Sequence, residues 1–107
     1  IFVRSFAMVD AAVSTEQIAE AFAKAFAGEP FVRVPKKRLP EVVAVSGSNY
    51  AEVSFEYGPE ENGVRTVACF SATDNLIKGG AGQAVQTMNI VLGIDETTSI
   101  ADSGGFP

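Results

Sequence analysis

The stretch AEVSFEYGPEENGVRTVACFSA, residues 51–72, decides the fold expected for this chain. Its two ends, 51–57 and 64–72, carry Val and aromatic residues, which favour β-strands because their side chains pack well on a pleated surface. Between them, residues 58–63 include a proline and the dipeptide Asn62-Gly63, a composition typical of a hairpin connection. The stretch therefore predicts two antiparallel strands joined by a hairpin.

A strand and a helix are expected before this hairpin. Residues 1–9 read as a strand, and Ser14 and Gln17 have the spacing of a capping box, in which two side chains bind free amides at a helix start. Gly28 is placed to end the helix in a left-handed conformation. Apolar residues recur at helical spacing and predict a side that faces the core: Ile18, Phe22 and Phe26.

An irregular connection is expected between the helix and the hairpin. It is bracketed by Pro30, Pro35 and Pro40 and includes a short strand at 31–34. Residues Glu41–Val45 are rich in Val and predict a further strand, which Ser46–Asn49 then breaks.

Residues 74–92 have helical periodicity, with Asp74 as a plausible N-cap and Gly93 as the stop. At 100° per residue one stripe collects Asn75, Lys78, Gly79, Gly82, Gln86 and Asn89. The opposite side collects Ile77, Ala81, Ala84, Val85, Met88, Val91 and Leu92. Amides, glycines and one lysine suit a surface covered by a ligand or by another part of the protein, whereas a solvent-facing surface usually carries Lys and Glu. Tight packing of the stripe on a sheet or a neighbouring helix remains open.

Composition limits the possible functions. The chain has 107 residues, 47% of them hydrophobic, which suits one globular domain. A net charge of -5 opposes nucleic-acid binding, and no apolar stretch is long enough to span a membrane, so neither partner is expected. A single cysteine is compatible with a cytoplasmic location. The chain has no His, and we find no metal-ligand spacing, so no metal site is expected.

Three blocks of sequence point to a known family. Residues 74–89 read DNLIKGGAGQAVQTMN, and LGIDETT follows at 92–98. Upstream lie EPFVRV at 29–34 and GSNY at 47–50. These blocks resemble the N-acetyl-glutamyl-phosphate reductases and follow one another along the chain as they do in that family, which typically reads DNLVKGAAGQAVQNMN in the last helix. Gly80 departs from that pattern, in which Ala is more frequent.

The resemblance implies an α+β fold with a mixed, largely antiparallel sheet covered by two helices, similar to the C-terminal domain of glyceraldehyde-3-phosphate dehydrogenase. Residues 1–93 would be part of a C-terminal catalytic and dimerisation domain, and 94–107 a polar, Gly-rich tail that is poorly ordered unless a neighbour holds it. The expected partners are a Rossmann domain outside this chain, which binds NADP, further copies in a homo-oligomer, and a small-molecule substrate.

The implied activity is the NADP-dependent reduction of N-acetyl-glutamyl 5-phosphate to the semialdehyde in arginine biosynthesis. The resemblance places Asn75, Lys78, Gly79 and Gly82 near the nicotinamide end of NADP. In the family a Cys thiolate attacks the acyl phosphate and a His assists proton transfer. Neither group is expected here, because Cys69 lies within a strand and reads as a small core residue. The chain alone should therefore be inactive, with no catalytic residue of its own.

Two other functions remain open. The chain could be a separate noncatalytic module that serves dimerisation or binding, or part of a related reductase of aminoadipate in lysine biosynthesis. The basic residues Arg33, Lys36, Lys37 and Arg38 could meet a phosphate, although a solvated loop is the better interpretation. Glu60-Glu61 reads as a soluble loop tip.

Overall fold

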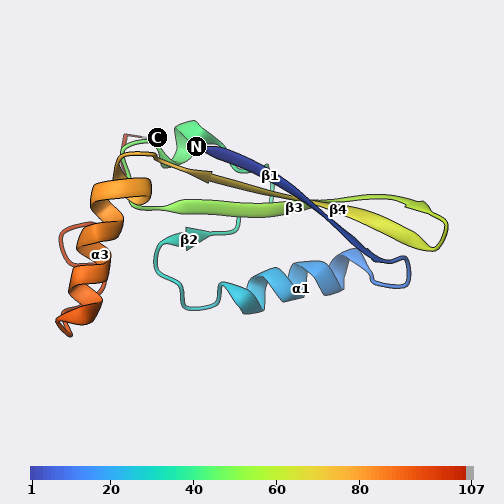
Figure 1. The fold of residues 1–107 in the computed structure, drawn as a ribbon, viewed down its shortest axis with the longest axis horizontal. Helices are drawn as coiled ribbons and strands as arrows, with labels where there is room; N and C mark the ends of the chain where they lie inside the picture. The colour runs from blue at the N-terminus through green and yellow to red at the C-terminus, as the bar shows by residue number, and fades with distance from the viewer. Residues whose placement is uncertain (106–107) are drawn as a thin grey trace.

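The computed structural model describes residues 1–105 and is built around a four-stranded mixed sheet (Figure 1). The strands are β1 (Phe2–Asp10), β2 (Val32–Arg33), β3 (Ala51–Glu61) and β4 (Val64–Thr73). Their order in the sheet is β1-β4-β3-β2, in which β4 pairs antiparallel with both β1 and β3 while the short β2 joins β3 in parallel. The α+β class and the mixed, largely antiparallel sheet are confirmed. Residues 106–107 of the expected tail lie outside the described residues.

The β3–β4 hairpin is confirmed, but its connection is shorter than the sequence predicts. Asn62 and Gly63 form the turn with φ of 52° and 80°, and this left-handed pair matches the twist of the two strands. Gly58 and Pro59 belong to β3, where the register shifts between Tyr57 and Glu60. A bulge there accommodates the proline within the strand.

Helix α1 (Thr15–Ala25) begins where the sequence predicts but ends earlier, with Phe26 as its C-cap; Gly28 lies two residues beyond and has the predicted left-handed conformation, with φ of 79°. Ser14 Oγ accepts from Gln17 N at 3.2 Å, and Gln17 Oε1 accepts from Ser14 N at 2.8 Å, which completes the capping box. The helix lies along one face of the sheet (Figure 1), where the Phe22 ring packs 5.1 Å from the ring of Phe55 in β3.

The predicted strand at Glu41–Val45 is wrong. These residues instead form a short helix, α2 (Val42–Val45), with Glu41 as its extended N-cap. Valine favours strands by local propensity, but Ala44 and Val45 are fully buried in this helical turn. Burial in the core therefore outweighs local preference, and the described residues form three helical segments rather than two.

The final helix also differs from the uniform helix predicted for 74–92. It starts with a π-helical turn, η1 (Ile77–Ala81), and continues as α3 (Gly82–Val91) beyond one end of the sheet (Figure 1). Gly79 N donates to Asp74 O and Ala81 N to Leu76 O, each at 2.8 Å and across five residues. Such π turns are rare and often occur at functional sites.

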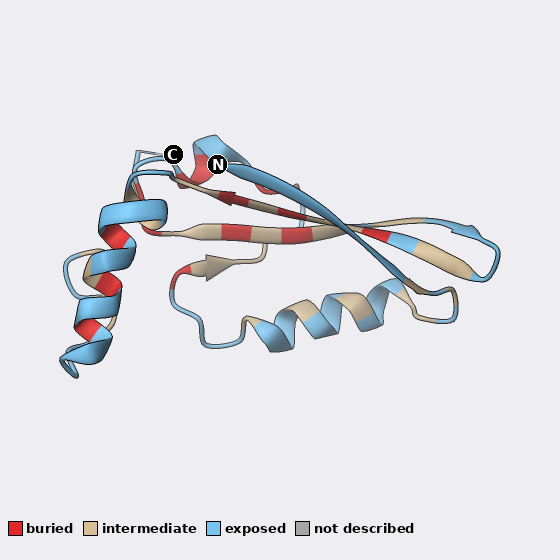
Figure 2. Ribbon diagram, viewed as in Figure 1, coloured by how far each residue is buried: buried red, intermediate tan, exposed pale blue. Residues whose placement is uncertain are grey.

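The buried residues of the regular elements lie in β3, β4, α2 and α3, and much of the remaining sheet is open (Figure 2). The most deeply buried apolar residues are Phe31, Ala44, Val45, Val67, Phe70 and Ala72. Strand β1, at the edge of the sheet, is exposed along almost its whole length. No helix within residues 1–105 is long and apolar enough to cross a membrane.

Candidate functional site

Within α3, the polar stripe of the last helix is turned toward the protein rather than toward water (Figure 2). Gly82, Gln86 and Asn89 are the buried residues of α3. On the apolar side of the helix, Val91 is 77% exposed and Met88 is 50% exposed. The chain's own turns at 47–49 and 95–98 thus cover the lower part of the stripe, as tight packing would require.

Gln86 is the centre of a buried polar network. It is 8% exposed, and its Oε1 accepts from Asn49 Nδ2 at 2.9 Å and from Lys78 Nζ at 2.6 Å. Its Nε2 donates to Glu96 Oε1 at 2.6 Å. The network joins α3 to the GSN turn and to the segment after the helix, so it binds together three segments that are distant in sequence.

Gly82 permits the close approach on which this network depends. A Cβ at this position would overlap Asn49 Oδ1 and would lie 2.7 Å from Ile77 Cγ2. Asn49 is 1% exposed, and its Oδ1 receives no hydrogen bond within the described part of the chain. The glycine is therefore explained by packing against the GSN turn.

Asp74 fixes the start of the helix and the same turn at once. Its Oδ1 accepts from Leu76 N at 2.8 Å and Ile77 N at 2.7 Å, while its Oδ2 accepts from Gly47 N at 2.9 Å. Hydrogen bonds from Gly47, Ile77 and Leu76 lower the pKa of this carboxyl group below its usual value, so Asp74 carries a negative charge at neutral pH. The N-cap of η1 is Leu76 rather than the predicted Asp74, but the Asp74 carboxylate still binds amides at the helix start that a ligand would otherwise use.

The other three candidate cofactor contacts lie nearer the surface. Asn75 and Gly79 are exposed, and a Cβ on Gly79 would lie 3.7 Å from Asn75 Oδ1, so the two are neighbours. Lys78 is half-buried, with Nζ 5.4 Å from the centre of the Phe31 ring. Asn75 and Gly79 are therefore exposed neighbours at the start of the helix, whereas the Lys78 ammonium is directed to Gln86 and the Phe31 ring, and Gly82 is buried.

Burial lowers the pKa of the Lys78 ammonium, and the carboxylates of Glu96 and Glu29 oppose part of that shift. An ammonium has three N–H donors, and Lys78 uses one of them, toward Gln86. Within residues 1–105, the other two N–H donors of Lys78 have no hydrogen-bond partner and are left for a ligand. Lys78 can therefore bind an acceptor oxygen of a ligand, and the contacts with Gln86 and the Phe31 ring restrict the direction in which its ammonium points.

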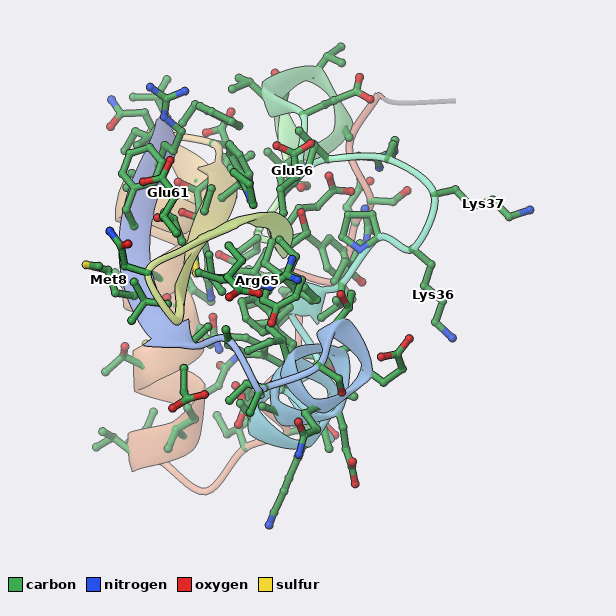
Figure 3. All side chains as sticks on the ribbon, turned by 90° about the vertical axis from the view of Figure 1, so that its right-hand side faces the viewer. Met8, Lys36, Lys37, Glu56, Glu61 and Arg65 are labelled. Carbon is green, nitrogen blue, oxygen red and sulfur yellow. The ribbon has the colours of Figure 1, made fainter. Side chains whose placement is uncertain are left out.

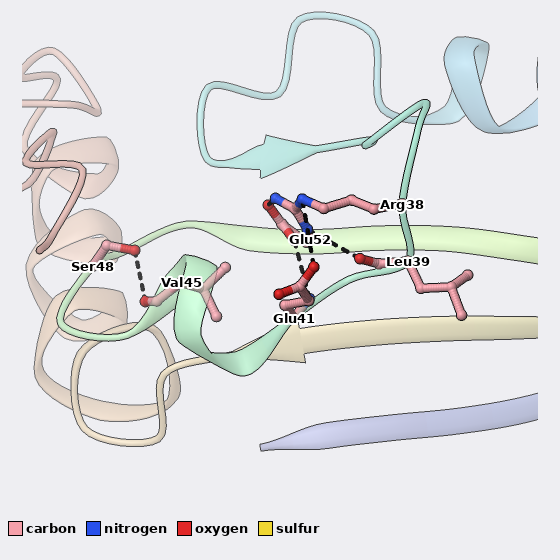
Figure 4. Close-up of polar contacts among 6 residues, drawn as sticks. All are labelled: Arg38, Leu39, Glu41, Val45, Ser48 and Glu52. Atoms are coloured by element: carbon pink, nitrogen blue, oxygen red, sulfur yellow. Dashed lines mark hydrogen bonds and ion pairs between the residues drawn. The ribbon is translucent and has the colours of Figure 1, made fainter. Parts of the chain in front are cut away.

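The basic residues of the connection do not form one anion site. Lys36 and Lys37 extend away from the rest of the molecule (Figure 3), while the Arg33 guanidinium lies 3.7 Å from the centre of the Tyr50 ring. Arg38 binds Glu52 with two hydrogen bonds of 2.6 Å (Figure 4). The structure thus gives the four basic residues three separate environments.

Glu52 is a structural residue that sequence reasoning missed. It is 1% exposed in β3, and its Oε2 also accepts from Glu41 N at 3.2 Å (Figure 4). Burial alone would raise the pKa of Glu52, but the hydrogen bonds from Arg38 and the Glu41 amide outweigh it and leave the pKa below its usual value. The one available signal was a charged residue inside a strand whose neighbours are apolar.

Cys69 lies in β4 as a partly buried free thiol, consistent with a packing role. No group of three or more His, Cys, Asp or Glu residues within 1–105 could hold a metal ion. What the described part of the chain does present is the surface of η1, held in place by the network around Gln86.

Comparisons with known proteins agree with the resemblance noted in the sequence. An N-acetyl-gamma-glutamyl-phosphate reductase of Symbiobacterium thermophilum is 45% identical over 85% of this chain and 26% of its own length. The protein of the same name from Thermus thermophilus is 44% identical over 100% of this chain and 30% of its own length. A protein of Haloquadratum walsbyi, named a putative LysW-L-2-aminoadipate/LysW-L-glutamate phosphate reductase, is 46% identical over 89% of this chain and 28% of its own length.

The chain thus spans less than a third of the length of these relatives and matches their C-terminal part. The family described as semialdehyde dehydrogenase, dimerisation domain, matches residues 1–75, which include all four strands. Its match covers well over half of the 107 residues. The chain therefore belongs to the semialdehyde dehydrogenase dimerisation-domain family.

Proposed function

We propose that this chain is the C-terminal portion of an NADP-dependent reductase that converts N-acetyl-glutamyl 5-phosphate to N-acetyl-glutamate 5-semialdehyde in arginine biosynthesis. The observation that carries the proposal is the 39–50% identity to proteins named N-acetyl-gamma-glutamyl-phosphate reductase, over 82–100% of the chain. The domain would adopt the architecture of the C-terminal domain of glyceraldehyde-3-phosphate dehydrogenase. Residues 1–93 would belong to that domain and 94–107 to its tail.

The surface of η1 would meet the nicotinamide end of NADP. Asn75 offers an exposed side-chain amide, Lys78 offers two N–H donors, and Gly79 has no Cβ to keep a flat ring away. These groups suit a carboxamide, which both donates and accepts hydrogen bonds. Gly82 would contribute indirectly, because its close contact with Asn49 would hold the neighbouring η1 in position for the cofactor.

The remaining machinery would come from outside this chain. A Rossmann domain would bind most of the NADP molecule, which supplies the hydride when bound. The reactive thiol and the imidazole that transfers a proton would also come from outside this chain, since the chain has no His and its single Cys is held within β4. The role of this chain would be to complete the cofactor and substrate sites and to join subunits in a homo-oligomer.

A second substrate is supported by one specific observation. The relative from Haloquadratum walsbyi is as similar to this chain as the N-acetyl-gamma-glutamyl-phosphate reductases are, with 46% identity over 100 residues, and its name specifies aminoadipate or glutamate carried on LysW. A phosphate reductase of carrier-bound aminoadipate or glutamate is therefore the alternative function. The two reductases differ in the group attached to the substrate nitrogen rather than in the acyl phosphate that is reduced.

The test is an assay of the full-length protein that contains this chain. NADPH oxidation would be followed with N-acetyl-glutamyl 5-phosphate and, separately, with carrier-bound aminoadipyl phosphate. We expect turnover with the acetylated substrate, and a loss of about tenfold in kcat/KM for Asn75→Ala. Thr87→Ala, an exposed substitution on α3, is the matched control. Turnover with neither substrate would instead indicate a noncatalytic binding or dimerisation module.

A further inference from the structure

The Lys78 ammonium lies at the end of a chain of short hydrogen bonds that starts in the segment after α3. Glu96 Oε1 accepts from Gln86 Nε2 at 2.6 Å, and Gln86 Oε1 accepts from Lys78 Nζ at 2.6 Å. A primary amide suits this place because one end donates and the other accepts. The carboxylate thus orients the amide, and the amide then presents its oxygen to the ammonium.

Neighbouring residues hold the hydrogen-bonded chain of Glu96, Gln86 and Lys78, here called the relay, from two sides. Asn49 Nδ2 donates to the same Gln86 oxygen at 2.9 Å from the GSN turn. Asn89 Nδ2 donates to Glu96 O at 3.3 Å and to Thr98 O at 3.0 Å, which fixes the turn that carries Glu96. Both Asn49 and Asn89 are buried, so the relay rests on well-packed groups.

A lysine on a helix surface normally samples many rotamers, and ordering it on ligand binding opposes affinity. Lys78 is already restricted by Gln86 and by the Phe31 ring, yet two of its N–H donors have no partner within the described residues. Preorganisation of this kind favours binding because less conformational entropy is lost when the ligand arrives.

We propose that Gln86 and Glu96 are positioning residues, which hold the Lys78 ammonium in place for an acceptor oxygen of the bound dinucleotide. This inference rests on the proposed function, in which Lys78 contacts NADP. The conformation of the segment after α3 would then affect cofactor affinity through Glu96, although neither Gln86 nor Glu96 contacts the cofactor itself.

The test measures the dissociation constant of NADPH by fluorescence titration of the full-length protein. Lys78→Met should weaken binding about tenfold, because a charge-assisted hydrogen bond is lost. Gln86→Met should weaken it about fivefold, and less than twofold of further loss should follow when it is added to Lys78→Met. Gln83→Met is the matched control, an exposed glutamine one turn earlier in the same helix, and should change binding less than twofold.

A second pair of variants separates positioning from general loss of structure. Glu96→Gln keeps an acceptor oxygen for Gln86 and should bind NADPH within about twofold of the parent protein, whereas Glu96→Ala should match Gln86→Met. Thermal unfolding followed by circular dichroism would establish that each variant is folded.

Each negative result has a distinct meaning. Unchanged NADPH affinity in Lys78→Met would remove Lys78 from the proposed cofactor site and would overturn the positioning inference with it. Weakened binding in Lys78→Met, together with normal binding in Gln86→Met, would overturn the positioning inference alone. Fully additive losses in the Gln86→Met, Lys78→Met double variant would likewise show that Gln86 acts independently of the ammonium.

Discussion

At the scale of single residues, Gly82 illustrates how a glycine can be required by packing alone. An added Cβ would overlap Asn49 Oδ1 and would lie 2.9 Å from Ile77 O. We expect Gly82→Ala to lower the free energy of unfolding by about 1–3 kcal/mol, because overpacking outweighs the higher helix propensity of Ala. Urea unfolding of the variant and of the parent protein measures this difference.

Gly80 provides the matched control for that substitution. A Cβ at this position would meet only Asn75 O, at 3.6 Å, and the residue is exposed. Gly80→Ala should therefore leave the protein unchanged or stabilise it by up to about 1 kcal/mol. Equal unfolding curves for the two variants would show that the contact between Gly82 and Asn49 does not constrain the helix.

The ion pair between the buried Glu52 and the partly exposed Arg38 predicts a specific pH dependence of stability. The pKa of Glu52 in the folded protein lies below its ordinary value of 4.5, so the ionised form stabilises the fold. This contribution is complete above the pKa of the unfolded chain and is lost as the pH falls through the lower pKa of the folded state. Chemical unfolding between pH 7 and pH 3 should show a decline that is smaller in Glu52→Gln.

Removal of the arginine tests the same pair at neutral pH. Arg38→Met leaves a buried carboxylate without its counter-charge, which should lower the free energy of unfolding by about 2 kcal/mol. The loss should be smaller than for a fully buried pair, because the Arg38 side chain is 35% exposed. Lys37→Met, an exposed neighbour, is the control, and an equal effect of the two substitutions would contradict the prediction.

At the scale of elements, the Asp74 carboxylate joins the start of η1 to the GSN turn, because it accepts hydrogen bonds from the backbone amides of Leu76 and Ile77 and from that of Gly47. Asp74→Ala should increase hydrogen exchange at the amides of Leu76, Ile77 and Gly47 together, because all three lose one acceptor. Hydrogen exchange resolved by NMR measures these amides.

Asp95→Ala is the control for Asp74→Ala. Asp95 makes a similar local contact, in which Oδ1 accepts from Thr97 N at 2.9 Å, but this contact lies outside the GSN turn. Faster exchange at Leu76 and Ile77 with unchanged exchange at Gly47 would show that Asp74 caps the helix without joining it to the turn.

The elements that sequence reasoning predicted are those set by neighbouring residues. The capping box of Ser14 and Gln17 and the Asn62-Gly63 turn each require only a few adjacent side chains. By contrast, α2 forms because Ala44 and Val45 fill the core, which is a tertiary effect that a run of valines conceals.

The candidate site was predicted only in part, because helical spacing shows which residues of one helix share a side but not which other segments contact them. Helical spacing grouped Gln86 and Asn89 on one stripe with Lys78, and the structure places all three in one network. It could not indicate that Glu96 and Asn49 complete this network, because their contacts join segments separated by 10 and 37 residues along the chain from Gln86. Helical spacing also could not predict η1, because a π-helical turn leaves no mark in a pattern read at 100° per residue.

At the scale of the whole molecule, one face of the edge strand β1 carries large apolar side chains that the chain itself leaves exposed. Met8 is 72% exposed and Phe6 is 63% exposed, and both lie on the face of β1 opposite α1, because the Phe55 ring that contacts α1 is in register with Cys69 and Ser5 on the other face. Their register partners in β4, Thr66 and Ala68, share that face. The surface falls within residues 1–75, which match a dimerisation domain, so we expect this face to bind a second copy of the protein.

A charge placed on that face should therefore separate the subunits. Met8→Glu should weaken self-association of the full-length protein by about 30-fold or more, because an interface that buries large apolar side chains does not tolerate an unpaired carboxylate. Analytical ultracentrifugation across a range of concentrations measures the dissociation constant. Ala7→Glu is the matched control, since Ala7 is the next residue of β1 and is exposed on the other face. Equal weakening by both variants would locate the contact at the edge of β1 instead of on its face, and association unchanged by Met8→Glu would place the interface elsewhere.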